Sequence, residues 1–258
     1  MRLNNIFYMP YPGNKRNEIK QFYNFLNFEG IDTIIEPYAG TSVISYYIAS
    51  LHPNIKVILN DNNPYIKEIY DIINDDDKVE QFENKVNEIK NTITTKEAYD
   101  NVIKNKDIYG WLIGNKYFNM RPNLCPIGHR GNNTLQKLFK FRDYKIFDFY
   151  RNPNVSFTCQ DAISVYENYK NNVNHMIIMD PPYIAACNSF YLDDSMNIYE
   201  HLNDNNITNE KAKIYLILEN QWIIKLLFRT NNTLFQYDKK YELSKRKTTH
   251  LLISNEKN

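Results

Sequence analysis

The sequence predicts an α/β protein built around a parallel β-sheet, and two stretches carry that prediction. The run His175–Met179 is short, apolar and rich in Ile and Met, which is typical of a parallel strand buried on both faces. The stretch Asp32–Asp61 follows the order strand, turn, helix, strand, which is the repeating unit of a parallel sheet. Open sheets of this class bind ligands at the carboxyl ends of their strands, so functional residues are expected there.

Composition narrows the class of protein. The 258 residues are 43% hydrophobic and 24% charged, with a formal net charge of +1, so no global field demands a nucleic-acid partner. The cysteines Cys125, Cys159 and Cys187 form no CxxC pair and the histidines are scattered, which argues against a disulfide scaffold or a metal site. No signal peptide or membrane-length apolar run is present. We therefore expect a soluble cytoplasmic protein that is not secreted, with no metal and no membrane partner.

The predicted elements of the first quarter of the chain follow one another closely. A Pro-Gly turn at Tyr11–Lys15 precedes a segment with helical apolar spacing that extends to about Phe28. Lys15 is either a solvated lysine of the first turn or part of a loop that closes over a ligand. Strands are predicted at Asp32–Pro37 and Lys56–Leu59, with a helix from Val43 to about Leu51 between them.

The turn Tyr38–Ser42 indicates a cofactor without phosphate groups. It has one glycine, Gly40, where a dinucleotide-binding turn has three, while an acidic residue, Asp61, follows roughly 20 positions later, as a ribose requires. S-adenosylmethionine carries adenosine and a sulfonium amino acid but no pyrophosphate. Glu36 is placed to interact with its ammonium group and Asp61 to accept from its ribose hydroxyls. The alternative is a purely structural turn with a solvated Asp61.

From Pro64 to Arg151 the pattern changes to helices and irregular links. Helices are predicted at Tyr65 to about Asn74, at Val79 to about Ile93 and at Thr134 to Tyr150. Residues Lys96–Arg151 contain 11 Lys and Arg against 5 Asp and Glu, a candidate electrostatic footprint for a polyanion. Arg and Asn are the side chains that pair with guanine and adenine edges. The alternative is a solvated basic face around a small helical core.

The sheet then resumes with strands at Asn154–Thr158 and Ile214–Leu218, and a hairpin at Thr233–Tyr237 and His250–Ser254 closes the chain. Asp161 either hydrogen-bonds the adenine of the cofactor or caps the next helix. The basic connection of the hairpin either lies on phosphates or is a solvated loop. The candidate DNA-binding residues of the insertion and of this connection are Lys116, Asn119, Arg121, Arg130, Lys245, Arg246 and Lys247.

The stretch Asp180–Tyr183 reads Asp-Pro-Pro-Tyr and follows the predicted strand His175–Met179 directly. Its prolines cannot continue a sheet ladder, so they stiffen the exit from the strand. The loop offers a carboxylate, a free carbonyl and an aromatic face, which suit a planar ring that bears an amino group. The alternative is a strand-ending turn.

The order of these motifs resembles that of Dam-type adenine-specific DNA methyltransferases, in the alpha-group arrangement. The resemblance implies a Rossmann-like seven-stranded methyltransferase sheet with one antiparallel strand and an inserted, mainly helical target-recognition domain. The catalytic, S-adenosylmethionine-binding domain is expected at residues 1–64 and 151–258 and the inserted domain at 65–150. The family's catalytic residues fall on Asp180, Pro181, Pro182 and Tyr183, and its cofactor contacts fall on Tyr11, Lys15, Glu36, Tyr38, Ala39, Gly40, Asp61 and Asp161.

Three departures from the family pattern are visible. Ser42 stands where relatives often have a second glycine, and Glu219-Asn220 stands in place of a Ser-Asn pair. The recognition segment, Phe118 to Gly128, is shorter than that of relatives, so a GATC target does not transfer.

The function implied is methyl transfer from S-adenosylmethionine to the exocyclic amine of a flipped adenine in a specific duplex DNA sequence. A restriction-modification role would add a cognate endonuclease as a partner. An RNA adenine methyltransferase and a catalytically silent nucleic-acid-binding relative are the alternatives. A protein-glutamine methyltransferase ranks lower, because Asn would be expected in place of Asp180.

Overall fold

The computed structural model describes residues 6, 15–92, 104–105, 107–112, 140–184, 196–204, 207–228, 232–240 and 247–256. They form two compact units. The sheet unit takes the described residues of Lys15–Asn62, Asn154–Asn188 and Asp193–Asn258, and the helical unit takes Ile6 and those of Asn63–Pro153. Each unit has its own packing, and each is described by itself below.

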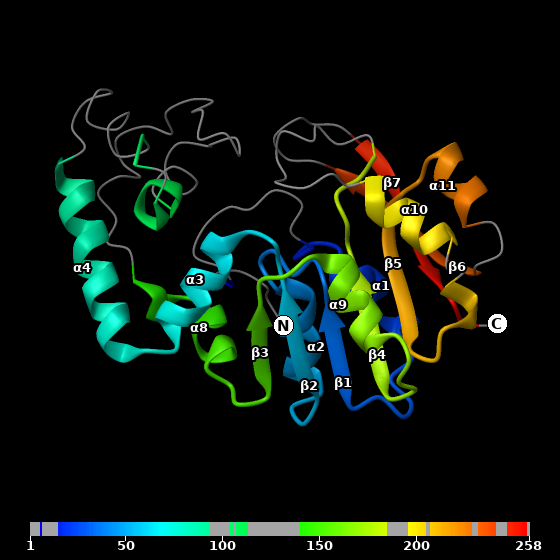
Figure 1. Ribbon diagram of the computed structural model, residues 1–258, viewed down its shortest axis with the longest axis horizontal. Helices are drawn as coiled ribbons and strands as arrows, with labels where there is room; N and C mark the ends of the chain where they lie inside the picture. The colour runs from blue at the N-terminus through cyan, green and yellow to red at the C-terminus, as the bar shows by residue number, and fades with distance from the viewer. Residues whose placement is uncertain are drawn as a thin grey trace. The chain divides into compact units, whose positions relative to one another are not determined.

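The sheet unit contains a mixed sheet of seven strands in the order β3-β2-β1-β4-β5-β7-β6 (Figure 1). Neighbours from β3 to β5 pair in parallel, while β7 lies antiparallel between β5 and β6. The predicted α/β class and the seven-stranded sheet with one antiparallel strand are therefore confirmed. The strands are β1 (Thr33–Glu36), β2 (Lys56–Asn60), β3 (Val155–Thr158), β4 (His175–Met179), β5 (Lys213–Glu219), β6 (Asn232–Lys240) and β7 (Lys247–Ser254).

The centre of the sheet is buried on both faces, which explains its continuous apolar strands. Ile35 of β1 stands opposite Ile58 on β2 and Ile177 on β4. Ile35 and Ile177 are fully buried. Burying one such side chain contributes about 1.5–3 kcal/mol to the free energy of unfolding. The paired positions of β1, β2 and β4 set the ends of these strands side by side. The residues that follow each strand therefore lie at the same edge of the sheet.

Short helices accompany the sheet, and two of them complete its main core. Val165 and Tyr166 of α9, together with Ile198 and Leu202 of α10, pack against buried residues of β4 and β5 (Figure 1). The first helix is shorter than predicted, because the chain tightens into a 3₁₀ turn after Phe22. The helices of the sheet unit are α1 (Ile19–Phe22), η1 (Tyr23–Phe25), α2 (Val43–Leu51), α9 (Ala162–Tyr169), α10 (Met196–Asp204), η4 (Ile207–Asn209) and α11 (Trp222–Leu227).

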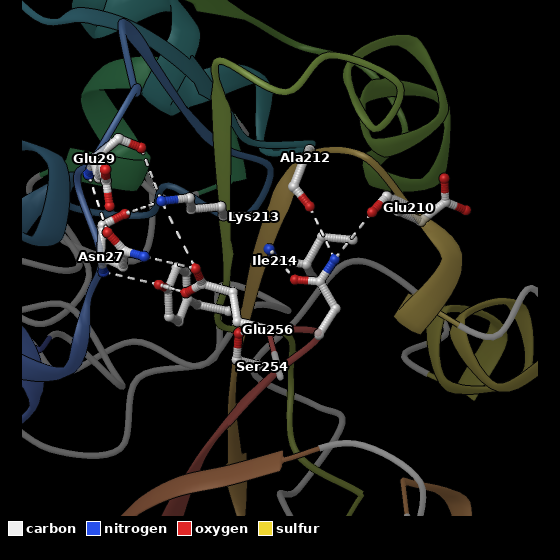
Figure 2. A network of polar contacts seen from close by, with 10 residues as sticks. Asn27, Glu29, Glu210, Ala212, Lys213, Ile214, Ser254 and Glu256 are labelled. Carbon is white, nitrogen blue, oxygen red and sulfur yellow. Dashed lines mark hydrogen bonds and ion pairs between the residues drawn. The ribbon is translucent and has the colours of Figure 1, made fainter. Parts of the chain in front are cut away.

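A polar network joins the start of β5 to the residues that follow β7 (Figure 2). The Lys213 ammonium donates to the carbonyls of Asn27, at 3.1 Å, and Glu29, at 2.8 Å. The Asn255 side-chain oxygen accepts from Ile214 N–H at 2.8 Å, and its amide nitrogen donates to the carbonyls of Ala212, at 2.9 Å, and Glu210, at 3.4 Å. These bonds satisfy backbone groups where the ladder ends.

The helical unit is built on α3 (Pro64–Ile73) and α4 (Asp76–Thr92), followed by η2 (Phe141–Asp143) and α8 (Lys145–Tyr150). Asn63 caps α3 by accepting from Tyr65 N–H at 3.0 Å. On α4, Val79, Phe82 and Val86 share one buried face, as their spacing predicts.

One predicted helix of this unit is wrong in extent. Thr134–Tyr150 was expected as a single helix, but Tyr144 has an extended backbone (φ −116°, ψ 140°), so α8 begins only at Lys145. Residues 134–139 lie outside the described part of the chain. The inserted target-recognition domain stays a prediction. No described helix is long and apolar enough to cross a membrane.

Candidate active site

Five carboxylates occupy the carboxyl edge of the parallel part of the sheet, and Glu219, the last residue of β5, is one of them. Glu36 ends β1, Asp61 follows β2, Asp161 follows β3 shortly after its end, and Asp180 follows β4 directly. Parallel strands end at a common edge, so the topology brings together residues that are far apart in the sequence. This is the edge at which the sequence predicted the functional residues.

Glu36 is a buried carboxylic acid at the centre of this edge. Its side chain is 2% exposed, and Ser45 of α2 donates both its backbone N–H, at 3.2 Å, and its hydroxyl to the same carboxylate oxygen. Burial raises the pKa of Glu36 to about 8, the Ser45 hydrogen bonds lower it in part, and the neighbouring Asp180 carboxylate raises it. Glu36 is therefore ready to gain a cationic partner, which would favour its ionised form.

The turn after β1 adopts backbone angles that glycine favours. Gly40 has a φ of 47° and Ser42 a φ of 52°, both in the left-handed region. Ser42 thus adopts a left-handed conformation that glycine tolerates more easily, although it carries a side chain. The backbone N–H of Gly40 donates to the Asp61 carboxylate at 2.8 Å. This bond holds Asp61 against the turn, and a contact of either residue with a cofactor stays a prediction.

Asp161 is exposed and caps α9. Its carboxylate accepts from Ser164 N–H at 2.9 Å and from the Ser164 hydroxyl at 3.3 Å. The capping alternative is therefore the arrangement observed, and a contact of Asp161 with the cofactor stays a prediction. Tyr38 and Ala39 lie in the turn, where Ala39 N–H donates to Asn60 O at 2.8 Å.

Asp180 is held by donors on both of its carboxylate oxygens. The Lys15 ammonium forms an ion pair with Oδ2, and the Tyr183 hydroxyl donates to Oδ1 at 2.7 Å. The prolines between Asp180 and Tyr183 are buried, and Pro182 O accepts from the Tyr199 hydroxyl of α10 at 3.1 Å. The carboxylate that ends β4 is thus fixed in direction by its own loop and by Lys15.

The Tyr183 ring lies inside the protein. It is 5% exposed, its edge-to-face partner His250 of β7 lies 4.8 Å away between centroids, and the Lys15 ammonium lies 5.4 Å from its centroid. Burial and the Asp180 carboxylate raise the pKa of Tyr183 well above its usual value, so the hydroxyl remains a donor. Stacking on a base stays a prediction, and it requires this ring face to be uncovered.

A buried charged cluster around Glu18 contacts Tyr183 through His250, and sequence reasoning missed it. Glu18 contacts the Lys239 ammonium at 2.6 Å, His250 Nδ1 at 3.3 Å and the Tyr237 hydroxyl at 3.2 Å. Burial alone would raise the pKa of Glu18, but the charges of Lys15 and Lys239 and the His250 hydrogen bond lower it to about 2. No local pattern indicates this cluster, because its members come from both ends of the chain.

The remaining predicted residues are not all described. Lys247, which begins β7, is exposed. Among the described residues, no group of three or more His, Cys, Asp or Glu is arranged to hold a metal ion. The predicted site residues that lie outside the described part of the chain are Tyr11, Lys116, Asn119, Arg121, Arg130, Lys245 and Arg246.

The carboxyl groups at this edge fit S-adenosylmethionine. The buried Glu36 carboxyl suits its ammonium group, and the Asp61 carboxylate, fixed by the Gly40 N–H, suits a pair of ribose hydroxyls. The Asp61 carboxylate does not suit a phosphate, since like charges repel.

Comparisons with solved structures find distant methyltransferases. A precorrin-6y C5,15-methyltransferase from Geobacter metallireducens GS-15 is 9% identical, with a TM-score of 0.42 over 95% of this chain and 92% of that chain. The N-terminal domain of human METTL16 in complex with SAH is 8% identical, with a TM-score of 0.36 over 93% of this chain and 68% of that chain. Both scores are below 0.5, so the fold assignment rests on the observed strand order. No curated protein sequence matches the chain.

The family comparison covers residues 11–122, which include the turn Tyr38–Ser42. Residues 11–122 match the model of the D12 class N6 adenine-specific DNA methyltransferases, whose members depend on S-adenosylmethionine. This match confirms the resemblance that the motif order indicated. Over residues 11–122, the chain is thus similar to the D12 class N6 adenine-specific DNA methyltransferases.

Proposed function

We propose that this protein transfers a methyl group from S-adenosylmethionine to the exocyclic amine of an adenine flipped out of a specific duplex DNA sequence. The observation that carries the proposal is the Asp180 carboxylate, fixed by Lys15 and Tyr183 at the carboxyl end of β4. It lies on the same sheet edge as the Gly40–Asp61 pair that suits the cofactor. A family whose members act on DNA adenine supports the choice of substrate.

The cofactor is held by the residues of the turn and the adjacent strand ends. Glu36 binds the ammonium group, Asp61 binds the ribose, and the turn Tyr38–Gly40 lies against the adenosine. When bound, S-adenosylmethionine supplies an electrophilic methyl group on a sulfonium. Ionisation of Glu36 accompanies binding, because a cation beside the carboxyl offsets the burial that otherwise keeps it protonated.

Asp180 prepares the adenine amine for attack. The amine lone pair is delocalised into the ring, which makes the nitrogen a poor nucleophile. Asp180 and the carbonyl of Pro181 accept hydrogen bonds from its two N–H groups, which favours a pyramidal nitrogen with a directed lone pair. The methyl group passes from sulfur to this nitrogen, S-adenosylhomocysteine leaves, and the nitrogen then loses one proton to solvent. As the nitrogen becomes positive, the fixed carboxylate stabilises the charge without reorganising. The amine gains access to Asp180 by replacing the Lys15 ammonium on Oδ2, while the Tyr183 hydroxyl keeps its hydrogen bond to Oδ1.

The target base must leave the duplex to reach Asp180, because base pairing hides its amine. Tyr183 stacks on the extruded base in place of its neighbours. Residues 65–150 act as the target-recognition domain, and residues 1–64 and 151–258 as the catalytic domain. The candidate phosphate and base contacts are Lys116, Asn119, Arg121, Arg130, Lys245, Arg246 and Lys247.

The test uses Asp180→Ala, with Asp32→Ala as a matched control. Asp32 is an exposed aspartate that precedes β1, at the opposite edge of the sheet. Duplex DNA and structured RNA are incubated with methyl-labelled S-adenosylmethionine, digested to nucleosides and analysed for N6-methyladenine. We expect methylated adenine in duplex DNA with the parent protein and with Asp32→Ala, and none with Asp180→Ala, while cofactor affinity measured by calorimetry is retained.

Near-normal turnover by Asp180→Ala would refute the role of this carboxylate. Methylation of RNA but not of DNA would show that the substrate is RNA and not duplex DNA. Binding of DNA and cofactor without any methyl transfer by the parent protein would indicate a catalytically silent relative.

A further inference from the structure

Asn60 is a fully buried polar residue at the last position of β2, directly before Asp61. The proposed mechanism gives it no role. A polar side chain at 0% exposure is costly unless its hydrogen bonds are made, so its partners indicate why it is there.

The Asn60 side chain makes every hydrogen bond that a primary amide can make. Its nitrogen donates to Pro37 O and to Gln160 O, both at 3.0 Å. Its oxygen accepts from the Thr158 hydroxyl and from Gln160 N–H, both at 2.9 Å. An amide has two N–H donors and an oxygen with two lone pairs, so this set is complete.

These bonds join three strand ends that carry proposed cofactor residues. Pro37 follows Glu36 at the end of β1 and leads into the turn Tyr38–Gly40. Gln160 precedes Asp161 after β3. The backbone carbonyl of Asn60 also accepts from Ala39 N–H at 2.8 Å, which adds the turn itself. One side chain thus spans β1, β2 and β3 at the edge where the adenosine would lie.

We propose that Asn60 is a positioning residue whose amide fixes the ends of β1 and β3 relative to Asp61 and thereby sets the affinity for the adenosine part of S-adenosylmethionine. This inference rests on the proposed function. Asn60 acts through Asp61, Gly40 and the turn, and it does not itself touch the cofactor. Asp cannot replace it, because a carboxylate would turn an oxygen toward the carbonyls of Pro37 and Gln160. Ala would remove the partner that Asn60 offers to the buried Pro37 carbonyl, to the carbonyl and N–H of Gln160 and to the Thr158 hydroxyl, whose other acceptor is Leu59 O at 3.3 Å.

The chain contains a matched control at the opposite edge of the sheet. Asn255 also uses its amide as a clamp, accepting from Ile214 N–H at 2.8 Å and donating to Ala212 O at 2.9 Å and Glu210 O at 3.4 Å. Figure 2 shows the surrounding network at Glu210, Ala212 and Ile214. Its bonds serve the start of β5, far along the strands from the carboxyl edge. A loss of Asn255 therefore reports the purely structural cost of removing such a clamp.

The experiment measures the affinity of the full chain for S-adenosylhomocysteine by calorimetry, together with thermal unfolding, for the parent protein, Asn60→Ala, Asn60→Asp and Asn255→Ala. We expect both Asn60 variants to raise the cofactor Kd by about tenfold or more. In methylation assays, their KM for the cofactor rises while kcat at saturating cofactor changes by less than about threefold. Asn255→Ala lowers the unfolding temperature but leaves the cofactor Kd within about twofold of the parent value.

Two variants of Thr158, which disturb the structure less, serve as the test if the Asn60 variants do not fold. Thr158→Val removes one of the four bonds and should raise the cofactor Kd, whereas Thr158→Ser keeps the hydroxyl and should restore it. Unchanged Kd in the folded Asn60 variants, or in Thr158→Val if those do not fold, overturns the inference. An equal rise with Asn255→Ala also overturns it. If the parent protein itself fails to bind S-adenosylhomocysteine, the proposed function fails and this inference fails with it.

Discussion

The buried carboxyl of Glu36 makes the free energy of unfolding depend on pH. Its pKa is about 8 in the folded protein, against an ordinary value of 4.5. Between these two pH values the folded state keeps a proton that the unfolded state has lost. The free energy of unfolding therefore falls as the pH rises, since the folded state binds more protons. The contribution is fully present below about pH 4.5 and is lost by about pH 8.

The size of this effect follows from the pKa difference. Each pH unit corresponds to about 1.4 kcal/mol, so a pKa raised from 4.5 to about 8 corresponds to roughly 5 kcal/mol. This is an upper value, because relaxation and water penetration around an ionised Glu36 reduce it. Only part of the range is needed for a test, and between pH 5 and pH 8 a change of about 4 kcal/mol is expected at most.

Glu36→Gln removes the titration but keeps the shape of the site. The Gln amide oxygen can accept both hydrogen bonds from Ser45, as Glu36 Oε2 does. We expect the variant to match the parent protein in urea unfolding at pH 5 and to become increasingly more stable than it toward pH 8. Glu200→Gln, at an exposed position on α10, is the control and should show no such trend.

Circular dichroism at pH 5, 6, 7 and 8 measures the difference in the free energy of unfolding between variant and parent. A difference that does not change with pH would refute the reasoning, because it would mean that Glu36 is not held protonated by burial. In the same variant the cofactor should bind more weakly, since the neutral amide cannot balance the ammonium group. Adding S-adenosylhomocysteine to the parent protein at pH 8 should therefore recover part of its stability.

Two further changes test the loop and the cluster behind it. Tyr183→Phe removes the hydroxyl that donates to Asp180 at 2.7 Å and keeps the ring. A hydrogen bond to a charged group contributes about 1.5–3 kcal/mol, so kcat should fall by about tenfold to a hundredfold with an unchanged cofactor Kd, and a normal kcat would argue against this bond. Glu18→Gln removes the buried carboxylate that contacts the Lys239 ammonium and should lower the free energy of unfolding by about 3–5 kcal/mol at pH 7. The Glu18 pKa is lowered to about 2, so its contribution is present above about pH 4.5 and is lost toward pH 2; a urea-measured loss that persists at pH 2 would contradict this account.

Much of the sheet could be predicted because strands are local. A strand buried on both faces needs an apolar run, and His175–Met179 is such a run in the sequence and β4 in the structure. Residues that follow a strand are local too, so Asp61 and Asp180 could be placed at the carboxyl edge before any contact was known. The prediction of one helix over Thr134–Tyr150 was wrong in extent. Apolar spacing alone does not reveal that the backbone is extended at Tyr144.

The sequence by itself thus determined the class of sheet, the turn around Gly40 and the carboxylates that end the strands. Only the tertiary structure decided which distant side chains meet them. Lys15 reaches Asp180 across 165 positions, and Glu18 reaches Tyr237 across 219. It also decided that burial raises the pKa of Glu36 to about 8 and that the Tyr183 ring is buried. The physical reason is that burial and charge pairing depend on what the whole fold brings close, whereas periodicity and motif spacing record only neighbours along the chain.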